Sequence, residues 1–153
     1  MENAKKITVS LDELYPIIKE KIESGGTVQL PITGTSMLPL LVWGRDTVEI
    51  VKCEKAKKYD IIFYRRDNGH FVLHRIIGIN DKGYILCGDN QTVKEYGIND
   101  RHIIAVVSSI TRNGKKFDVT KLSYKIYSRL WTMVRPFRRY ILVGARKIKG
   151  MFK

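Results

Sequence analysis

The segment from Thr27 to Val119 alternates short runs of β-branched and aromatic residues with polar turn residues. This pattern constrains the fold more than any other feature of the chain, because each run has the length and residue types of a strand. Seven such runs within about ninety residues predict a small antiparallel β-barrel or a sandwich. The predicted strands cover residues 27–32, 46–52, 60–65, 70–79, 83–87, 102–111 and 116–119.

Three turn sequences lie between these runs, and each predicts a hairpin that joins two directly paired strands. They are Asp67-Asn68-Gly69, Asp81-Lys82-Gly83 and Asn113-Gly114.

A short amphipathic helix is predicted before the first strand. Ser10 and Glu13 have the spacing of a capping box, and Gly25-Gly26 is a stop signal. Pro16 is tolerated only near the first turns, so the helix is expected to begin late or to bend there. The apolar positions recur at helical steps at Leu11, Leu14, Tyr15, Ile18 and Ile22.

The net charge of +13 is concentrated in the last part of the chain. Residues 1–120 carry 18 Lys and Arg against 15 Asp and Glu, whereas residues 121–153 carry 10 basic residues and no acidic one. We therefore divide the chain into a β domain with its N-terminal helix, residues 1–120, and a basic amphipathic helical tail, residues 121–153, interrupted at Pro136.

The tail has two interpretations, which the sequence leaves open. Its apolar face covers the open side of the barrel, or the tail attaches to an anionic membrane surface with Tyr127, Trp131 and Tyr140 at the interface. A nucleic-acid partner is not expected. The apolar residues at helical steps are Leu122, Ile126, Leu130, Met133, Phe137 and Ile141.

Other sequence features bear on the compartment. The first 23 residues mix charged and apolar side chains unlike a signal peptide, and no run of 18 apolar residues is present, so we expect no membrane span. Cys53 and Cys87 lack metal-ligand spacing and a disulfide framework. These features predict a cytoplasmic protein, with a peripheral position on the inner membrane face if the tail binds lipid.

One stretch, Gly34-Thr35-Ser36-Met37-Leu38-Pro39, follows the first predicted strand and presents a serine on a constrained corner that is not helical. A serine held in this way is a candidate nucleophile. Taken alone, the stretch fits better an ordinary turn whose hydroxyl groups make local hydrogen bonds.

Three later motifs follow it in order: Gly44-Arg45-Asp46-Thr47-Val48, Val72-Leu73-His74-Arg75-Ile76-Ile77-Gly78 and Gly88-Asp89-Asn90. Together the four motifs, over roughly residues 27–110, resemble the serine peptidase superfamily of type I signal peptidases and SOS-repressor autopeptidases. The His-Arg pair resembles the variant that uses histidine in place of lysine. The resemblance implies a small antiparallel β-barrel of that peptidase type.

The resemblance implies that Ser36 is the nucleophile and His74 its general base, because a neutral imidazole with an ordinary pKa near 6.5 can accept the serine proton near neutral pH. Asp89 would accept a hydrogen bond from the other imidazole nitrogen or from the loop near Ser36, with Asp100 as an alternative orienting acid. His70 and His102 are interpreted as non-catalytic.

The expected oxyanion site departs from the signal-peptidase pattern. Gly34 stands where signal peptidases usually have a serine, which resembles the SOS repressors. We therefore expect the Ser36 amide to donate to the oxyanion, with the Thr33 or Thr35 hydroxyl as a second donor.

The predicted function is that of a serine endopeptidase that cleaves leader or signal-type peptides with small residues before the scissile bond. It requires no cofactor, and no metal ligands are assigned. Two alternatives remain open: an autopeptidase similar to the SOS repressors, and a non-catalytic barrel whose basic tail binds a membrane or nucleic acid.

Overall fold

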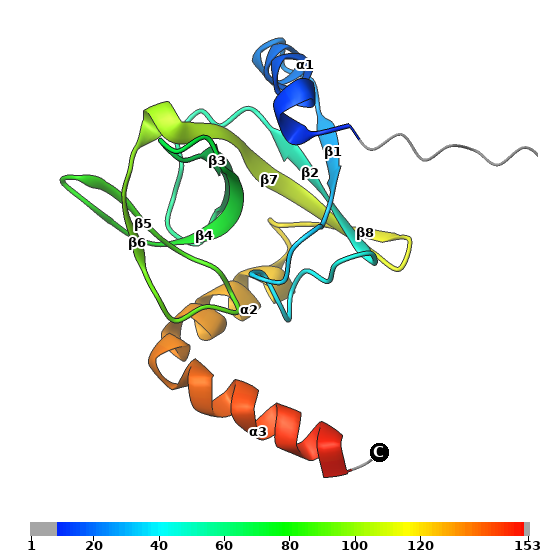
Figure 1. The fold of residues 1–153 in the computed structure, drawn as a ribbon, viewed down its shortest axis with the longest axis vertical. Coiled ribbons are helices and arrows are strands. Elements are labelled where there is room, and N and C mark those ends of the chain that lie inside the picture. The colour runs from blue at the N-terminus through cyan, green and yellow to red at the C-terminus, as the bar shows by residue number, and fades with distance from the viewer. Residues whose placement is uncertain (1–8, 152–153) are drawn as a thin grey trace, which may run out of the picture.

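The structure, a computed structural model, describes residues 9–151, which fold into one antiparallel β-sheet with helices at its two ends (Figure 1). The strands are β1 Val28–Pro31, β2 Asp46–Val51, β3 Ile61–Arg65, β4 Phe71–Asn80, β5 Gly83–Cys87, β6 Glu95–Ile98, β7 Ile103–Arg112 and β8 Lys115–Asp118. The helices are α1 Leu11–Glu23, α2 Leu122–Met133 and α3 Arg138–Met151, with short 3-10 turns η1 Asp100–His102 and η2 Arg135–Phe137.

The sheet has the strand order β1-β2-β7-β3-β4-β5-β6, and β8 pairs with β7 outside this path. Within residues 9–151, β1 and β6 do not pair with each other, so the sheet is open and the predicted closed barrel is not shown. The antiparallel, mainly β architecture is confirmed, and all seven predicted strands are present. Strand β6 was not predicted, because its four residues include Gly97 and lack an apolar alternation.

The three predicted hairpins are confirmed. The turn at 67–69 joins β3 to β4, the turn at 81–83 joins β4 to β5, and the turn at 113–114 joins β7 to β8. Since the turns fix the register, His74 on β4 lies opposite Ile62 on β3, and Tyr64 lies opposite Val72. Tyr64 and His74 are therefore diagonal neighbours on the same face of the sheet.

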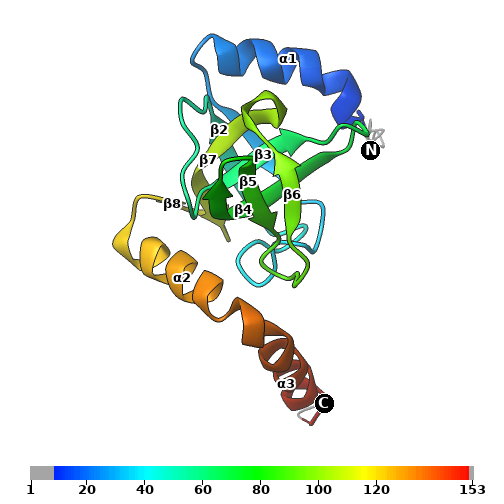
Figure 2. The same cartoon turned by 90° about the vertical axis from the view of Figure 1, so that its left-hand side faces the viewer.

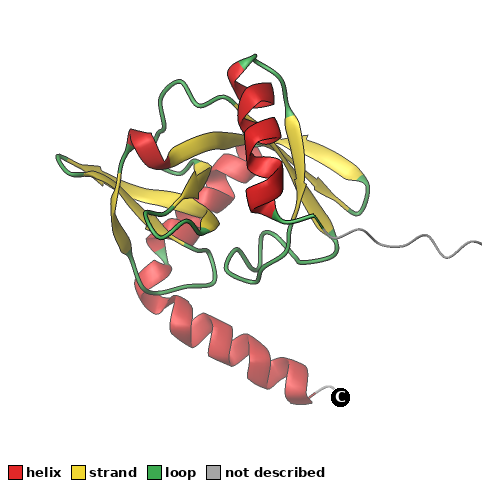
Figure 3. Cartoon of the chain, turned by 45° about the horizontal axis from the view of Figure 1, so that its top comes forward, coloured by secondary structure: helices red, strands yellow, loops and turns green. Residues whose placement is uncertain are grey.

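The N-terminal helix α1 has the predicted capping box, in which Ser10 and Glu13 exchange hydrogen bonds between side chain and backbone. The helix begins at Leu11 and runs through Pro16. It lies over one end of the sheet, beside β1 (Figure 3), and buries Ile18 and Ile22 against the core.

The loop between β1 and β2 carries Ser36 and is anchored by the apolar residues that follow it. Met37, Leu40 and Leu41 are buried in the same cluster as Val48 and Ile50 of β2. A second cluster of buried side chains occupies the part of the sheet from β3 to β6. The core thus anchors the residues that follow the candidate nucleophile, whereas residues 33–35 before it are exposed.

The tail forms α2 and α3 with the predicted interruption at Pro136, and α3 extends away from the sheet (Figure 2). The face of α2 turned to the sheet carries Tyr124 and Ser128, which are both buried. The predicted apolar stripe lies on the opposite face, and the interpretation that this stripe covers the sheet is wrong. The exposed residues are Leu122, Ile126, Leu130, Met133, Phe137 and Ile141.

Trp131 and Tyr127 are also placed differently from the sequence expectation. Both are half-buried on the sheet side of α2, whereas Tyr140 is exposed. Within residues 9–151, none of the helices combines the length and the apolar character needed to cross a bilayer.

Candidate functional site

Ser36 begins a turn that is held against the segment between β5 and β6. The Ser36 carbonyl accepts a hydrogen bond from the Asn90 amide at 2.8 Å, and the Asn90 side chain donates to the Thr35 carbonyl at 3.2 Å. The side chain of Ser36 is half-buried. The motifs around Ser36 and Asn90, far apart in the sequence, therefore form one contact.

Gly88 makes this contact close. A Cβ atom at Gly88 would lie 2.6 Å from the Ser36 carbonyl oxygen, nearer than any side chain can approach. Gly34 is different, because a Cβ there would meet no atom within 4 Å, and its residue is exposed. Packing therefore explains a glycine at 88 and not at 34.

The expected oxyanion donors lie on the solvent side of this loop. Thr33 and Thr35 are exposed. Within residues 9–151, neither the Ser36 amide nor its hydroxyl donates a hydrogen bond. The amide therefore has no partner among the described residues, and its role as an oxyanion donor stays a prediction.

His74 lies on β4 and is 4% exposed. Its Nδ1 atom is 3.2 Å from the Tyr64 hydroxyl oxygen and 3.7 Å from Oε2 of Glu95. Tyr64 in turn donates its hydroxyl hydrogen to Glu95 Oε2 at 2.6 Å. Arg66 donates two hydrogen bonds, of 2.7 and 2.8 Å, to the same carboxylate.

This chain of contacts fixes the tautomer of His74. A carboxylate can only accept hydrogen bonds, so the Tyr64 hydrogen must point to Glu95 and the phenol oxygen must accept from His74 Nδ1. The imidazole therefore carries its proton on Nδ1. Its Nε2 has no partner within residues 9–151 and keeps a lone pair that can accept a proton.

Burial and charge set the protonation states of this group. Burial, partly offset by the charge of Glu95, lowers the pKa of His74 to about 4, so the ring is neutral near pH 7. Burial would raise the pKa of Glu95, but the hydrogen bonds from Arg66 and Tyr64 outweigh it and lower that pKa. Burial and the bond to Glu95 raise the pKa of Tyr64, which stays a neutral phenol.

The structure gives Asp89 a role that differs from the predicted one. Asp89 accepts two hydrogen bonds from Arg75, at 2.9 and 2.8 Å, and both side chains are almost wholly buried. No hydrogen bond joins Asp89 to His74 among residues 9–151. The carboxylate that orients the imidazole is instead that of Glu95, through Tyr64.

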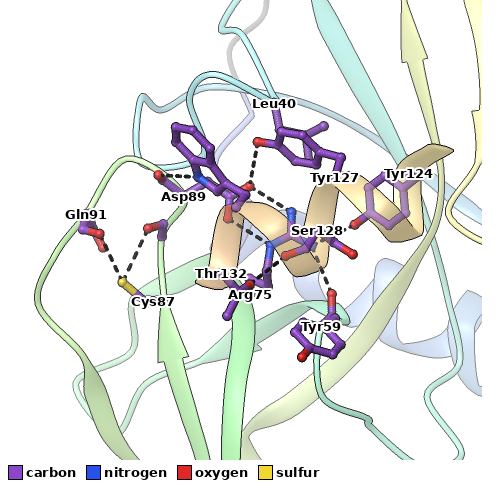
Figure 4. A network of polar contacts seen from close by, with 12 residues as sticks. Leu40, Tyr59, Arg75, Cys87, Asp89, Gln91, Tyr124, Tyr127, Ser128 and Thr132 are labelled. Carbon is purple, nitrogen blue, oxygen red and sulfur yellow. Dashed lines mark hydrogen bonds and ion pairs between the residues drawn. The ribbon is translucent and has the colours of Figure 1, made fainter. Parts of the chain in front are cut away.

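Helix α2 closes over this ion pair (Figure 4). Arg75 donates to the Tyr124 hydroxyl at 3.1 Å, and the Trp131 indole donates to the Asp89 carbonyl at 2.9 Å. Beyond the helix, the buried guanidinium of Arg138 donates to the carbonyls of Gly88 and Gln91. The tail thus holds the turn that contacts Ser36, and α2 is part of the folded unit.

The remaining acidic and histidine candidates lie elsewhere. Asp100 is exposed at the start of η1 and accepts a hydrogen bond from Tyr84 at 2.6 Å, so it does not orient His74. His70 is exposed next to the β3–β4 turn, and His102 lies 3.2 Å from Asp67. Within residues 9–151, neither histidine is hydrogen-bonded to Ser36 or to His74.

Two cavities adjoin the candidate residues. We call the first the apolar groove; it has a volume of about 630 Å³ and lies between α1, β1 and β4. Ser36 lines it together with Val72 and Leu73, the two residues before His74 on β4. Its apolar walls include Leu14, Ile18, Leu30, Ile32, Met37 and Phe71.

The second cavity, the basic groove, has a volume of about 640 Å³ and is lined by His74, Asn90 and Glu95. Three arginines, Arg66, Arg139 and Arg146, also line it. Asn90, which binds the Ser36 carbonyl, therefore borders the cavity that holds His74. Within residues 9–151 no hydrogen bond joins the Ser36 hydroxyl to His74, and the two side chains line different cavities.

No protein-family model matches this chain, and no curated protein or solved structure matches it significantly. The site therefore has to be interpreted from its own geometry. Among residues 9–151, no group of three or more His, Cys, Asp or Glu residues is placed to hold a metal ion. Cys53 and Cys87 are free thiols, and burial raises the pKa of each.

Tyr64, Glu95 and Arg66 were missed by the sequence analysis. Tyr64 lies within a strand that was predicted correctly, but a single tyrosine in a strand is usually a core residue. Glu95 begins β6, which was not predicted. Only the register of the predicted hairpin could have indicated the role of Tyr64, because two strands joined by the 67–69 turn place residues 64 and 74 on one face.

Proposed function

We propose that this chain is a serine endopeptidase that uses Ser36 as nucleophile and His74 as general base. The observation that carries the proposal is a buried, neutral imidazole whose Nδ1 is engaged by Tyr64 and whose Nε2 is free. Because this imidazole is neutral near pH 7, it can accept the serine proton without first losing a proton of its own. The resemblance of the four sequence motifs to signal-peptidase-like enzymes supports the same assignment.

The reaction would proceed through an acyl-enzyme. As the Ser36 oxygen attacks the scissile carbonyl, His74 Nε2 takes the hydroxyl proton, and the new oxyanion accepts a hydrogen bond from the Ser36 amide. The imidazolium then gives the proton to the leaving amine. Water, deprotonated by the same nitrogen, hydrolyses the ester and restores Ser36.

The Tyr64-Glu95 pair would act on the imidazolium. Once Nε2 is protonated, the ring is a cation in a buried site, and the carboxylate of Glu95 lies 3.7 Å from its Nδ1. An anion at that distance offsets part of the cost of the buried charge. We therefore assign Tyr64 and Glu95 as positioning residues, and Asp89 as an anchor for Arg75 and the turn beside Ser36.

The Ser36 hydroxyl must approach His74 for this chemistry. In the absence of substrate, catalytic hydrogen bonds are often long or unformed and tighten only in the complex. The Ser36 loop shares a groove with Val72 and Leu73, next to His74 on β4. Substrate bound in this groove would contact both the loop and β4, and the proposal requires that the loop then bring the Ser36 hydroxyl to His74.

The substrate we propose is an extended peptide. One edge of β1 is unpaired within the described chain, and β1 leads directly to Ser36, so a peptide backbone can pair with it. Side chains before the scissile bond would enter the apolar groove, with a small residue next to the bond as the resemblance implies. The segment after the bond would leave through the basic groove.

A fluorophosphonate probe tests the proposal, because it forms a stable bond only with an activated serine. We expect mass spectrometry to find the probe on Ser36 of the wild type, and not in Ser36→Ala or His74→Gln. The matched control Ser123→Ala removes an exposed serine of α2 and should label normally. Equal labelling of Ser36→Ala and wild type would contradict the proposal.

A peptide library with alanine at varied positions then tests the substrate class. We expect cleavage after small residues, lost in Ser36→Ala and in His74→Gln. If the only Ser36-dependent product is a fragment of the protein itself, the chain is an autopeptidase.

A further inference from the structure

We propose that the exposed apolar stripe of the tail docks on an anionic membrane surface. We define the exposed stripe as Leu122, Ile126, Leu130, Met133, Phe137 and Ile141, whose side chains are between 45% and 70% exposed. The stripe continues from α2 across η2 into α3. This inference is independent of the proposed peptidase activity.

No part of residues 9–151 covers the stripe. On the opposite face of α2, Tyr124 contacts Arg75 of β4 and Trp131 bonds the turn after β5, and Arg138 at the start of α3 bonds the same turn. These contacts fix the rotation of α2 about its axis, because turning the stripe inward would leave the buried Arg75-Asp89 pair without Tyr124. An apolar surface of this extent on one face usually marks an interaction site.

Charge indicates which occupant fits. Residues 121–153 contain ten basic residues and no acidic one, and Lys121, Lys125, Lys147 and Lys149 are exposed along the same two helices. A second copy would bring two such tails together, and their like charge opposes that contact. Nucleic acid would pair with the lysines but leave the apolar stripe in water.

An anionic bilayer surface would accommodate both the exposed apolar stripe and the basic charge of the tail. Apolar side chains of a helix that lies in the interface enter the acyl boundary, while lysines along its flanks meet the phosphate and carboxylate headgroups. Phe137 and Tyr140 are 65% and 73% exposed at the junction of the two helices, where aromatic rings suit the headgroup level.

The test is co-sedimentation of the full chain with vesicles of phosphatidylcholine, with and without phosphatidylserine. We expect binding that requires phosphatidylserine and falls as salt is added. The double variant Phe137→Ser, Ile141→Ser removes apolar contact without a change of charge. The double variant Lys147→Gln, Lys149→Gln removes two charges. Each of these two double variants should lower the partition coefficient by roughly tenfold or more.

Two matched variants control for general effects of surface changes. Ile79→Ser with Tyr96→Ser removes two exposed apolar side chains on the sheet, and Lys82→Gln with Lys115→Gln removes two exposed charges at hairpin turns. Both should bind vesicles like the wild type, and so should Ser36→Ala. Thermal melts should agree among the four double variants, because every side chain changed in them is exposed.

Three outcomes would overturn the inference. One is that the wild type does not bind phosphatidylserine vesicles at low salt, and another is that the tail variants bind as well as the controls. The third is a concentration-dependent dimer, or a complex with duplex DNA, that is lost in the Phe137→Ser, Ile141→Ser variant while vesicle binding is unchanged.

Discussion

The hydroxyl oxygen of Tyr64 lies 3.2 Å from Nδ1 of His74, and this contact decides which ring nitrogen is free. The geometry follows from the β3–β4 register, which makes the two residues diagonal neighbours. Glu95 on β6 then takes the Tyr64 hydrogen. This contact has three measurable consequences, and the turn beside Ser36 has two more.

Tyr64→Phe removes the acceptor of the Nδ1 hydrogen and keeps the ring that fills the core. Without that acceptor the imidazole can hold its proton on Nε2, the wrong nitrogen for a base, so we expect kcat to fall roughly a hundredfold, toward the lower end of a general base's contribution. KM should change little. A kcat within twofold of the wild type would show that the contact only packs the core.

The pH dependence of kcat/KM reports the His74 pKa. Since that pKa is lowered to about 4, the neutral base is already present at pH 6, and activity should rise through an apparent pKa near 4 and stay level from about pH 6 to 8. An unperturbed histidine would place the rise near 6.5. A midpoint at or above 6.5 would contradict the buried environment described for His74.

The same profile should move in Glu95→Gln. Because the charge of Glu95 raises the His74 pKa against the larger effect of burial, its loss should shift the acid limb to still lower pH while kcat decreases. The matched control is Asp100→Asn, an exposed carboxylate that binds Tyr84 and should leave the limb in place. If the acid limb has the same midpoint in wild type and in Glu95→Gln, the charge of Glu95 does not influence the pKa of His74.

Gly88→Ala tests the contact between the turn and the Ser36 loop. The new Cβ would lie 2.6 Å from the Ser36 carbonyl oxygen, so the loop must move. We expect a loss of about 1–3 kcal/mol in the free energy of unfolding, measured by urea denaturation, and a large drop in Ser36 labelling. Gly34→Ala is the matched control, since its Cβ enters open space and should leave the stability unchanged.

Asp89→Asn tests the revised role of Asp89. Removing its charge leaves the buried Arg75 guanidinium without its counter-ion, which should lower the free energy of unfolding by roughly 3–5 kcal/mol. The acid limb of the remaining folded protein should shift less than in Glu95→Gln, because Asp89 is not bonded to His74 and its charge raises the His74 pKa less than that of Glu95 does. A normal stability with a larger shift than in Glu95→Gln would restore Asp89 as the orienting acid.

The strands and turns were predictable from the sequence because their causes are local. The β-branched runs, the Gly-containing turns and the Ser10-Glu13 capping box act over a few residues, and each is found where it was predicted. The break near Pro136 belongs to the same class, since proline cannot continue the hydrogen bonds of a helix. The sequence also placed Ser36 in a turn and His74 in a strand.

Other features depended on contacts between distant segments. Periodicity showed that α2 has an apolar stripe, but the tertiary structure turned the other face to the sheet, where Tyr124 accepts a hydrogen bond from the buried Arg75 and Trp131 donates one to the main-chain carbonyl of Asp89. Tyr64 and Glu95 are 31 positions apart in the sequence, and the pairing of β5 with β6 places them in contact. The local sequence pattern determines where strands and turns form. Buried polar groups must find hydrogen-bond partners in space, and their pairing determines the arrangement of the site and the face of the tail that stays exposed.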